Sequence, residues 1–264
     1  MPRSGVLAAA LVLAGGAATA LGLSAAGSPG GDMAATLRLG SRAARGPPSA
    51  SVILIHGLGD SAEGLRGLVP YLANAVPHAT FILPTAPIRP ITMNGGYEMT
   101  GWYDIEGLSE RANENADGLE DSIAAINGLI DEEMARGVPP SRIVVSGFSQ
   151  GGAMSLWTGL TRAASADPLA AVVCMSGYIP AASQFRLTET GRRTPTRMFH
   201  GDVDPVVLMD FAVSSEALLR EQGHPDLAMK TYAGLPHSIN EDELGDVASF
   251  LASVLPPAGD AAEL

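Results

Sequence analysis

Cysteine is almost absent from this sequence. Cys174 is the only cysteine among 264 residues, so no intrachain disulfide can form and a metal site of clustered cysteines is excluded. The position of Cys174 inside the apolar run 171–175 predicts a buried, unreactive core residue.

Basic residues are also scarce. Lysine and arginine together number 16 against 28 aspartates and glutamates, which gives a formal net charge of −12, and Lys230 is the only lysine. A surface that binds nucleic acid needs clustered positive charge to meet the phosphates. A nucleic-acid partner is therefore not expected.

Repeats and low-complexity linkers are absent from most of the chain. An apolar fraction of 46% with 17% charged residues is typical of a globular protein with a substantial core. Nothing divides residues 51–256, so we predict a single domain there, followed by a C-terminal tail at 257–264.

The N-terminal residues differ from the rest. Residues 1–32 hold an Ala/Leu/Val-rich run with no charge from Ser4 to Gly31, which resembles a secretory signal or a marginal membrane anchor. Residues 33–50 form an Arg/Ala/Ser-rich linker without acids, a composition that transit peptides share. A chain that starts at Met33 would instead be cytoplasmic. Secretory or membrane-anchored, organellar and cytoplasmic locations all stay open.

From Ser51 onward, short apolar runs alternate with segments of helical periodicity. This alternation predicts the α/β class, with parallel strands joined by crossover helices. The predicted strands are 51–56, 80–83, 141–146, 170–175, 196–199 and 227–232, and the predicted helices are 65–75, 116–136, 152–160, 207–222 and 242–255. The stretch from Pro84 to Glu114 has little periodicity, and long stretches of this kind are usually lids or binding loops.

The most informative motif is Gly147-Phe148-Ser149-Gln150-Gly151, between a predicted strand and a predicted helix. A serine between two glycines at a strand-to-helix turn is the nucleophile elbow of α/β-hydrolases. The turn is so tight that a Cβ at either glycine would collide with the backbone. We therefore predict that Ser149 is a catalytic nucleophile held above the sheet.

A serine hydroxyl needs a base, and the base needs an acid that fixes its tautomer. In α/β-hydrolases the chain order is serine, acid, histidine. Among the five histidines, His237 follows the predicted strand 227–232 and is the predicted base. His56 precedes the serine and is in the wrong order, and His200 is expected to support the acidic loop beside it. The two others, His78 and His224, are predicted to be exposed loop residues.

The acid is expected in the loop after strand 196–199. That loop offers Asp202 and Asp204. One of them should face the histidine while the other caps backbone N–H groups in the turn. Spacing barely separates the two, so both stay candidates.

An oxyanion hole needs two N–H donors, each worth about 3 kcal/mol of the barrier. The Gln150 N–H directly follows the nucleophile. The second donor should come from the loop after the first strand, His56-Gly57-Leu58-Gly59-Asp60, where the Leu58 N–H is the natural choice. The two glycines of this loop are equally compatible with a tight turn alone.

Several segments together resemble the acyl-protein thioesterase / lysophospholipase / carboxylesterase family of small α/β-hydrolases. The resemblance extends from about Ser51 to Leu255 and implies a mostly parallel central sheet flanked by helices, without a separate cap domain. It also implies that Asp204, the second aspartate of G-D-x-D-P, is the acid beside Ser149 and His237. The segments are H-G-L-G-D-S at 56–61, G-F-S-Q-G-G-A-M at 147–154, S-G-Y at 176–178, H-G-D-V-D-P at 200–205 and H-S at 237–238.

The resemblance further implies a substrate loop beside an acyl-binding groove. Trp102-Tyr103-Asp104-Ile105 matches the W-[FY]-D-I pattern of that loop. Apolar residues between Pro84 and Glu114 either line this groove or pin the loop to the domain. We expect substrate binding by Ile91, Met93, Met99 and Trp102.

The expected function is that of a serine hydrolase that cleaves acyl esters or thioesters through an acyl-enzyme. The favoured substrates are proteins that carry S-palmitoyl or other fatty acyl groups. The alternative is a carboxylesterase or lysophospholipase that acts on small acyl esters or lysophospholipids, and a third reading is a catalytically inactive binding protein. We expect no metal or organic cofactor and a monomer or weak dimer, and the N-terminal segment could allow membrane association.

Overall fold

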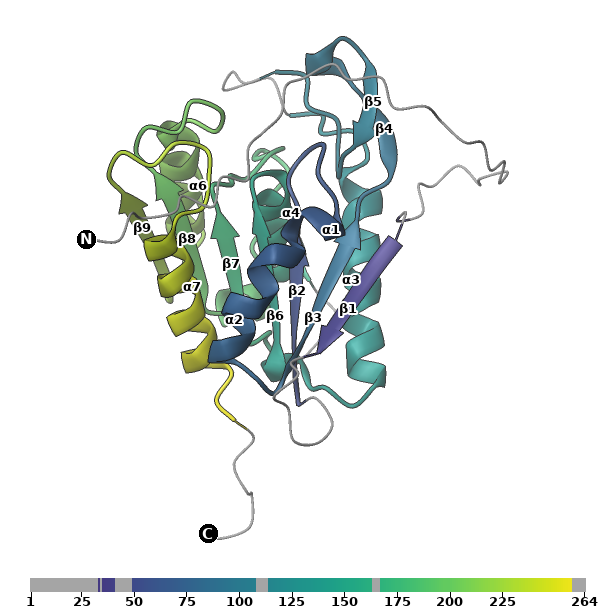
Figure 1. The fold of residues 1–264 in the computed structure, drawn as a ribbon. Coiled ribbons are helices and arrows are strands. Elements are labelled where there is room, and N and C mark those ends of the chain that lie inside the picture. Colours follow the sequence, from purple (N-terminus) through teal and green to yellow (C-terminus); the bar gives the residue numbers. More distant parts are fainter. Residues whose placement is uncertain (1–32, 34, 41–48, 108–113, 163–166, 258–264) are drawn as a thin grey trace, which may run out of the picture.

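A seven-stranded sheet forms the centre of the molecule (Figure 1). The computed structural model describes residues 33, 35–40, 49–107, 114–162 and 167–257. The strand order is β1-β3-β2-β6-β7-β8-β9, and only β1 is antiparallel to its neighbour. The strands are β1 (Ala35–Gly40), β2 (Ala50–Ile55), β3 (Ala79–Thr85), β6 (Ile143–Phe148), β7 (Ala171–Met175), β8 (Thr196–Gly201) and β9 (Leu227–Tyr232). This arrangement confirms the predicted α/β-hydrolase fold.

Helices cover both faces of the sheet (Figure 1). One face carries α1 (Ala62–Leu65), α2 (Val69–Ala75) and α7 (Glu241–Val254), and the other carries α3 (Leu119–Ala135), α4 (Gln150–Thr161) and α6 (Met209–Glu221). A short helix, α5 (Glu189–Arg192), packs beside α4. Within the described ranges, no helix has both the length and the apolar character needed to cross a membrane.

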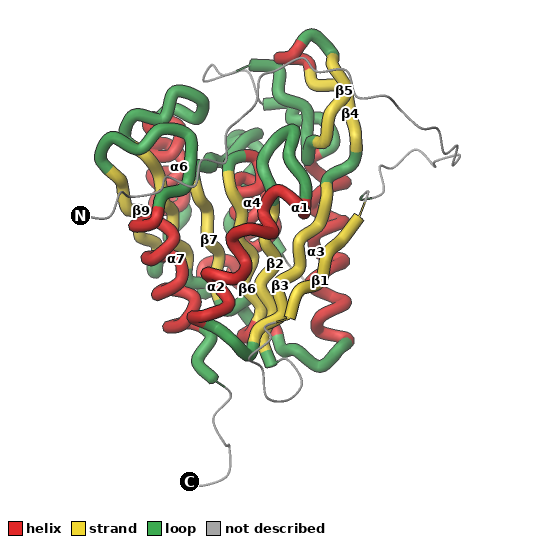
Figure 2. The backbone as a smooth tube through the Cα atoms, viewed as in Figure 1, coloured by secondary structure: helices red, strands yellow, loops and turns green. Residues whose placement is uncertain are grey.

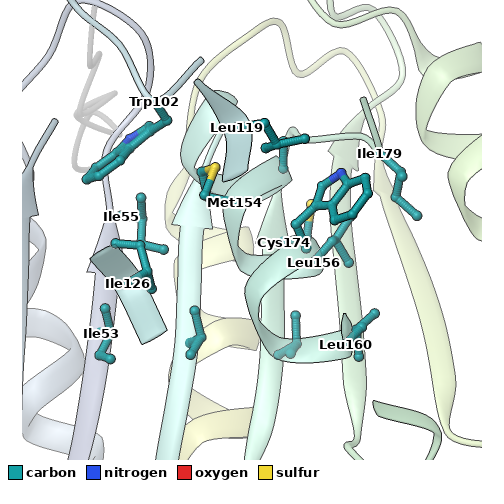
Figure 3. Close-up of a cluster of buried hydrophobic side chains, with 14 of the residues drawn as sticks. Ile53, Ile55, Trp102, Leu119, Ile126, Met154, Leu156, Leu160, Cys174 and Ile179 are labelled. Carbon is teal, nitrogen blue, oxygen red and sulfur yellow. The ribbon is translucent and has the colours of Figure 1, made fainter. Parts of the chain in front are cut away.

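The sheet is buried on both sides, which explains why its strands read as continuous apolar runs. Every residue of β2, β6 and β7 is buried, as parallel strands covered by helices require. Successive side chains alternate between two apolar clusters. Figure 3 shows one of them, in which Ile53 and Ile55 of β2 face Ile126 of α3.

The predicted strands and helices are confirmed with small shifts at their ends. The last strand has the predicted bounds, while the predicted helix 65–75 is divided into α1, a 3-10 turn at Arg66–Leu68 and α2. The division falls just before Pro70, which has no N–H to continue a helical ladder and is favoured in a first turn. Residues 1–32 and 258–264 lie outside the described part of the chain.

Strand β1 corrects the prediction that residues 33–50 are a linker. It pairs with β3, and Leu37 and Leu39 pack against the apolar cluster beneath α2 and α7. Arg38, on the opposite face, forms ion pairs with Glu132 and Glu133 of α3. The folded domain therefore includes Ala35–Gly40, because this strand contributes both apolar and charged contacts.

A hairpin lies within the stretch 84–114, which sequence periodicity left without elements. It consists of β4 (Ile88–Ile91) and β5 (Tyr97–Thr100), joined by a 3-10 turn at Thr92–Asn94 and by two glycines with positive φ, Gly95 and Gly96. The hairpin stands at the carboxyl ends of the parallel strands, where long connecting loops also gather (Figure 2). Parallel sheets place their functional sites at this end.

Candidate active site

Ser149 occupies a strained turn between β6 and α4. Its φ of 57° and ψ of −120° lie in a region that side chains rarely adopt. A Cβ on Gly147 would lie 2.1 Å from the Gly151 carbonyl oxygen, and a Cβ on Gly151 would lie 2.1 Å from the Ile55 carbonyl oxygen. Both positions therefore require glycine, which confirms the predicted elbow geometry.

The three predicted catalytic side chains lie in one hydrogen-bonded chain. His237 Nε2 is 2.9 Å from Ser149 Oγ, and His237 Nδ1 is 2.7 Å from Asp204 Oδ2. The residues come from the loops that follow β6, β8 and β9, so three distant parts of the sequence meet at one edge of the sheet. With Nδ1–H donating to the carboxylate, Nε2 is left to accept the serine proton.

The structure separates the two candidate acids. Asp204 uses Oδ1 to accept the backbone N–H groups of Val206 and Val207 at 2.8 and 2.9 Å, which leaves Oδ2 for the histidine. Asp202 instead accepts the Gly234 N–H at 2.6 Å. It fixes the turn that precedes the histidine, while Asp204 faces the imidazole itself.

The other histidines have structural partners. His200 Nε2 lies 2.7 Å from the Val207 carbonyl oxygen and supports the acidic loop, as predicted. His56 Nε2 accepts the Ala86 N–H at 3.0 Å, so its Nδ1 carries the proton and donates to the Gly57 carbonyl at 2.6 Å. Burial lowers the pKa of both histidines, which favours their neutral forms.

The prediction that His224 is exposed is wrong. Its side chain is buried, and its Nε2 lies 2.9 Å from the Thr196 hydroxyl, beneath the start of β8. Gly223-His224 indicated a loop, and the structure places His224 in one. Nothing in the sequence indicated that the histidine of this loop packs inward. His78 is only partly buried and its Nε2 lies 3.0 Å from the Leu255 carbonyl oxygen.

Both predicted oxyanion donors lie beside the nucleophile. A Cβ on Gly57 would be 3.2 Å from the Ser149 Cβ, so the loop after β2 abuts the serine. Gln150 is the first residue of α4, where an N–H has no acceptor within the helix and the helix dipole favours negative charge. The Leu58 N–H donates to no acceptor among the described residues.

The hairpin strand β5 holds this loop in place. The Gly59 N–H donates to the Thr100 carbonyl at 2.8 Å, and the Thr100 hydroxyl donates to the Asp60 carbonyl at 2.6 Å. Leu58 packs closely on Gly101, where an added Cβ would lie 3.1 Å from Leu58 Cδ1. The position of the predicted oxyanion donor therefore depends on the hairpin.

Sequence reasoning missed a second role for Gln150. Its side chain is buried; Oε1 accepts the Trp102 N–H at 2.8 Å and Nε2 donates to the Tyr103 carbonyl at 2.7 Å. The Trp102 indole N–H in turn donates to the His56 carbonyl at 2.8 Å. These bonds fasten the segment that follows the hairpin to the elbow and to the end of β2. The sequence did hold a signal, because Gln150 stands at the start of an otherwise apolar helix. A buried amide side chain needs hydrogen-bond partners, so its presence there predicts a polar contact.

Two of the four predicted substrate-binding residues differ from expectation. Ile91 and Trp102 have no exposed surface, and Trp102 belongs to the core cluster of Figure 3. They therefore pin the loop to the domain and do not present a surface to a ligand. Met93 and Met99 are partly exposed, and Met99 Sδ would lie 3.7 Å from a Cβ on Gly59.

The Cys174 thiol is buried, and burial raises its pKa to about 12. A thiol with so high a pKa has almost no thiolate, which is the reactive form. The prediction of an unreactive core cysteine is confirmed.

The chain matches known proteins over nearly all of its folded region. Residues 42–255 match the model of the Phospholipase/Carboxylesterase family. Acyl-protein thioesterase 1 of Gibberella zeae is 39% identical over 220 residues, which cover 79% of this chain and 92% of that protein. Acyl-protein thioesterase 1 of Neurospora crassa is 39% identical over 226 residues, which cover 81% of this chain and 91% of that protein.

Solved structures agree with these sequence matches. The crystal structure of acyl-protein thioesterase 2 from Zea mays aligns with a TM-score of 0.72 at 27% identity, and the alignment covers 84% of this chain and 99% of that one. The chain therefore belongs to the phospholipase/carboxylesterase family and is a hydrolase of the α/β-hydrolase fold.

Proposed function

We propose that the protein is an acyl-protein thioesterase, which removes S-palmitoyl or other fatty acyl groups from proteins by way of an acyl-enzyme on Ser149. The observation that carries the proposal is the unbroken chain of hydrogen bonds from Asp204 through His237 to the Ser149 hydroxyl. The names of the two fungal relatives support the choice of substrate.

In the acylation step, the Ser149 hydroxyl oxygen forms a bond with the thioester carbonyl carbon and its proton passes to His237 Nε2. Asp204 stabilises the resulting imidazolium. The carbonyl oxygen becomes an oxyanion, which the Leu58 and Gln150 N–H groups stabilise. The carbon–sulfur bond then breaks, the cysteine sulfur takes the proton from His237, and the protein leaves with a free thiol.

In the deacylation step, water replaces the thiol. His237 removes a proton from the water as its oxygen bonds to the acyl carbon, and the second tetrahedral intermediate is held by the same two N–H groups. The bond between Ser149 Oγ and the acyl carbon breaks, and His237 returns its proton to the serine. The products are the free fatty acid and the regenerated enzyme.

The hairpin supplies the surface for the acyl chain in this proposal. Met93 and Met99 are partly exposed, and Ile88 and Tyr97 have 67% and 68% of their surface exposed. Methionine adapts its shape to irregular apolar ligands. An acyl chain laid along this surface would gain about 0.8 kcal/mol for each buried CH₂.

The alternative function is hydrolysis of small esters or lysophospholipids. The family description names both phospholipases and carboxylesterases, and the chemistry at Ser149 would be the same. Only the leaving group and the length of the acyl chain differ.

A kinetic comparison distinguishes these substrates. We expect kcat/KM to rise with chain length across acyl esters and thioesters from acetyl to palmitoyl, and an S-palmitoyl peptide to be cleaved faster than a palmitoyl lysophospholipid. A preference for acetyl and butyryl esters would contradict the thioesterase proposal in favour of the carboxylesterase. Failure of a fluorophosphonate probe to label Ser149 would reject both functions and favour a binding protein.

A further inference from the structure

A buried carboxyl group lies on the helix that follows the His237 loop and has no part in the chemistry above. Glu243 belongs to the first turn of α7, shortly after His237 in the chain, and 0% of its surface is exposed. Asn240 caps the helix and accepts the Glu243 backbone N–H at 2.8 Å. The backbone of Glu243 is therefore fixed by the same turn that follows the predicted base.

In the part of the chain that the structure describes, no hydrogen-bond donor reaches the Glu243 side chain to stabilise a negative charge. Neither Oε1 nor Oε2 has a hydrogen-bond partner among the described residues. Glu133, which is also buried, makes an informative contrast. Its carboxylate accepts the Ser51 hydroxyl at 2.5 Å and pairs with Arg38. A buried carboxylate without such partners costs far more free energy than a protonated carboxyl group at the same place.

The charged groups near Glu243 also disfavour its ionisation. They are two carboxylates, Asp246 on α7 itself and Asp204 after β8. The other titratable side chains near it are Tyr232 on β9 and Cys174 on β7. The only nearby lysine, Lys230, is paired with Asp246. Burial first, and then the charges of Asp246 and Asp204, raise the pKa of Glu243 to about 8.

We propose that Glu243 is a positioning residue that works as a neutral, protonated acid. Protonation keeps a second negative charge away from Asp204, so that the first turn of α7, and with it the loop of His237, stays in the active geometry. Ionisation would create a buried anion beside the Asp204 carboxylate, and the protein would relieve it by displacing this turn. Activity then falls reversibly as the pH rises. This inference rests on the proposed catalytic role of Asp204 and His237.

The same group links the stability of the fold to pH. The folded protein keeps the Glu243 proton up to about pH 8, while the unfolded chain releases it near the ordinary glutamate pKa of 4.5. The stabilising contribution is therefore complete below that ordinary value and is lost as the pH rises through the folded pKa. Glutamine has the same shape and cannot ionise, so Glu243→Gln should remove this dependence.

The test compares the wild type with Glu243→Gln, and with Glu241→Gln as a matched control in the exposed part of the same helical turn. kcat for p-nitrophenyl butyrate and the Tm are measured from pH 6 to pH 9.5. We expect the wild type to lose most of its kcat above pH 8 with little change in KM, and to recover it on return to pH 7. The kcat of Glu243→Gln should not fall over this range, and its Tm at pH 8.5 should exceed that of the wild type by several degrees. Glu241→Gln should follow the wild type.

Two results would overturn the inference. One is an alkaline loss of kcat in Glu243→Gln that equals that of the wild type. The other is the absence, at pH 7, of a protonated-carboxyl carbonyl band from the infrared difference spectrum between wild type and Glu243→Gln. The infrared spectrum and the Tm do not require turnover, so they test Glu243 even if the enzyme cleaves no ester. A failure to cleave any ester would count against the proposed function alone.

Discussion

The elbow around Ser149 and the β4–β5 hairpin above it differ in what their glycines do. At the elbow, a Cβ on Gly147 or Gly151 would collide with backbone at 2.1 Å. In the hairpin, Gly95 and Gly96 have positive φ but nothing within 4 Å of an added Cβ. The first pair is required by close packing of the chain, and the second pair only by the shape of a turn.

This difference assigns separate tasks to the two regions. The elbow tolerates little change at its two glycines, because backbone atoms lie against both of them, so it fixes the position of the nucleophile. The hairpin can exchange exposed side chains such as Ile88 and Tyr97 at little cost to the fold, so it is suited to substrate selection. The bonds from Thr100 to the Gly59 loop and from Gln150 to Trp102 connect the two regions.

The largest effect is expected at the elbow itself. Ser149→Ala removes the nucleophile while the backbone around it stays as it is, so we expect kcat to fall by about 10⁶-fold with little change in Tm. Residual hydrolysis would come from the oxyanion donors and from substrate binding. Steady-state kinetics and thermal melting measure both quantities. Turnover near the wild-type rate would show that another residue is the nucleophile.

A smaller effect on kcat should distinguish the two aspartates of the acidic loop. Asp204→Asn presents an amide to His237 and favours the wrong tautomer, so kcat should fall by about 10⁴-fold. Asp202→Asn keeps an oxygen that can accept the Gly234 N–H, and kcat should change by roughly tenfold or less. The two variants are compared at pH 7 on the same ester. A greater loss in Asp202→Asn would reverse the assignment of the acid.

The sequence predicts the elbow well because its signal is local. The strand, the two glycines and the serine stand next to one another, and the chain order then points to His237. Spacing alone could not choose between Asp202 and Asp204, and only the family resemblance pointed to Asp204. The choice depends on which carboxylate turns toward a residue that lies more than thirty positions away in the sequence. That is a property of the folded loop and not of its spacing.

Other features had signals that were weak or easily misread. The alternation Leu37-Arg38-Leu39 is typical of an edge strand, but it lies in a segment with a linker-like composition. Asn94-Gly95-Gly96 between two short β-prone runs is a hairpin signal. Glu243 precedes the buried Val247 by one helical turn, which places it on the apolar face of α7. Its lack of partners could only be found from the structure.

The smallest effect is expected in the hairpin and depends on the substrate. Met99 is partly exposed beside the Gly59 loop, so Met99→Ala should lower kcat/KM for palmitoyl esters by about tenfold or less through lost apolar contact. We expect acetyl esters to be too short to contact this side chain and to be cleaved at the wild-type rate. Met93→Ala should act in the same direction. The measurement is kcat/KM across a series of acyl chain lengths.

Glu98→Ala is the matched control for this prediction. Glu98 is an exposed neighbour of Met99 on β5, and its side chain points to the opposite face of the strand. Its truncation should leave the chain-length profile unchanged. If Met99→Ala lowers kcat/KM equally for acetyl and palmitoyl esters, the side chain acts by holding the Leu58 loop in place. The division of tasks between elbow and hairpin would then fail at this residue, because a hairpin side chain would serve the reaction and not the choice of substrate.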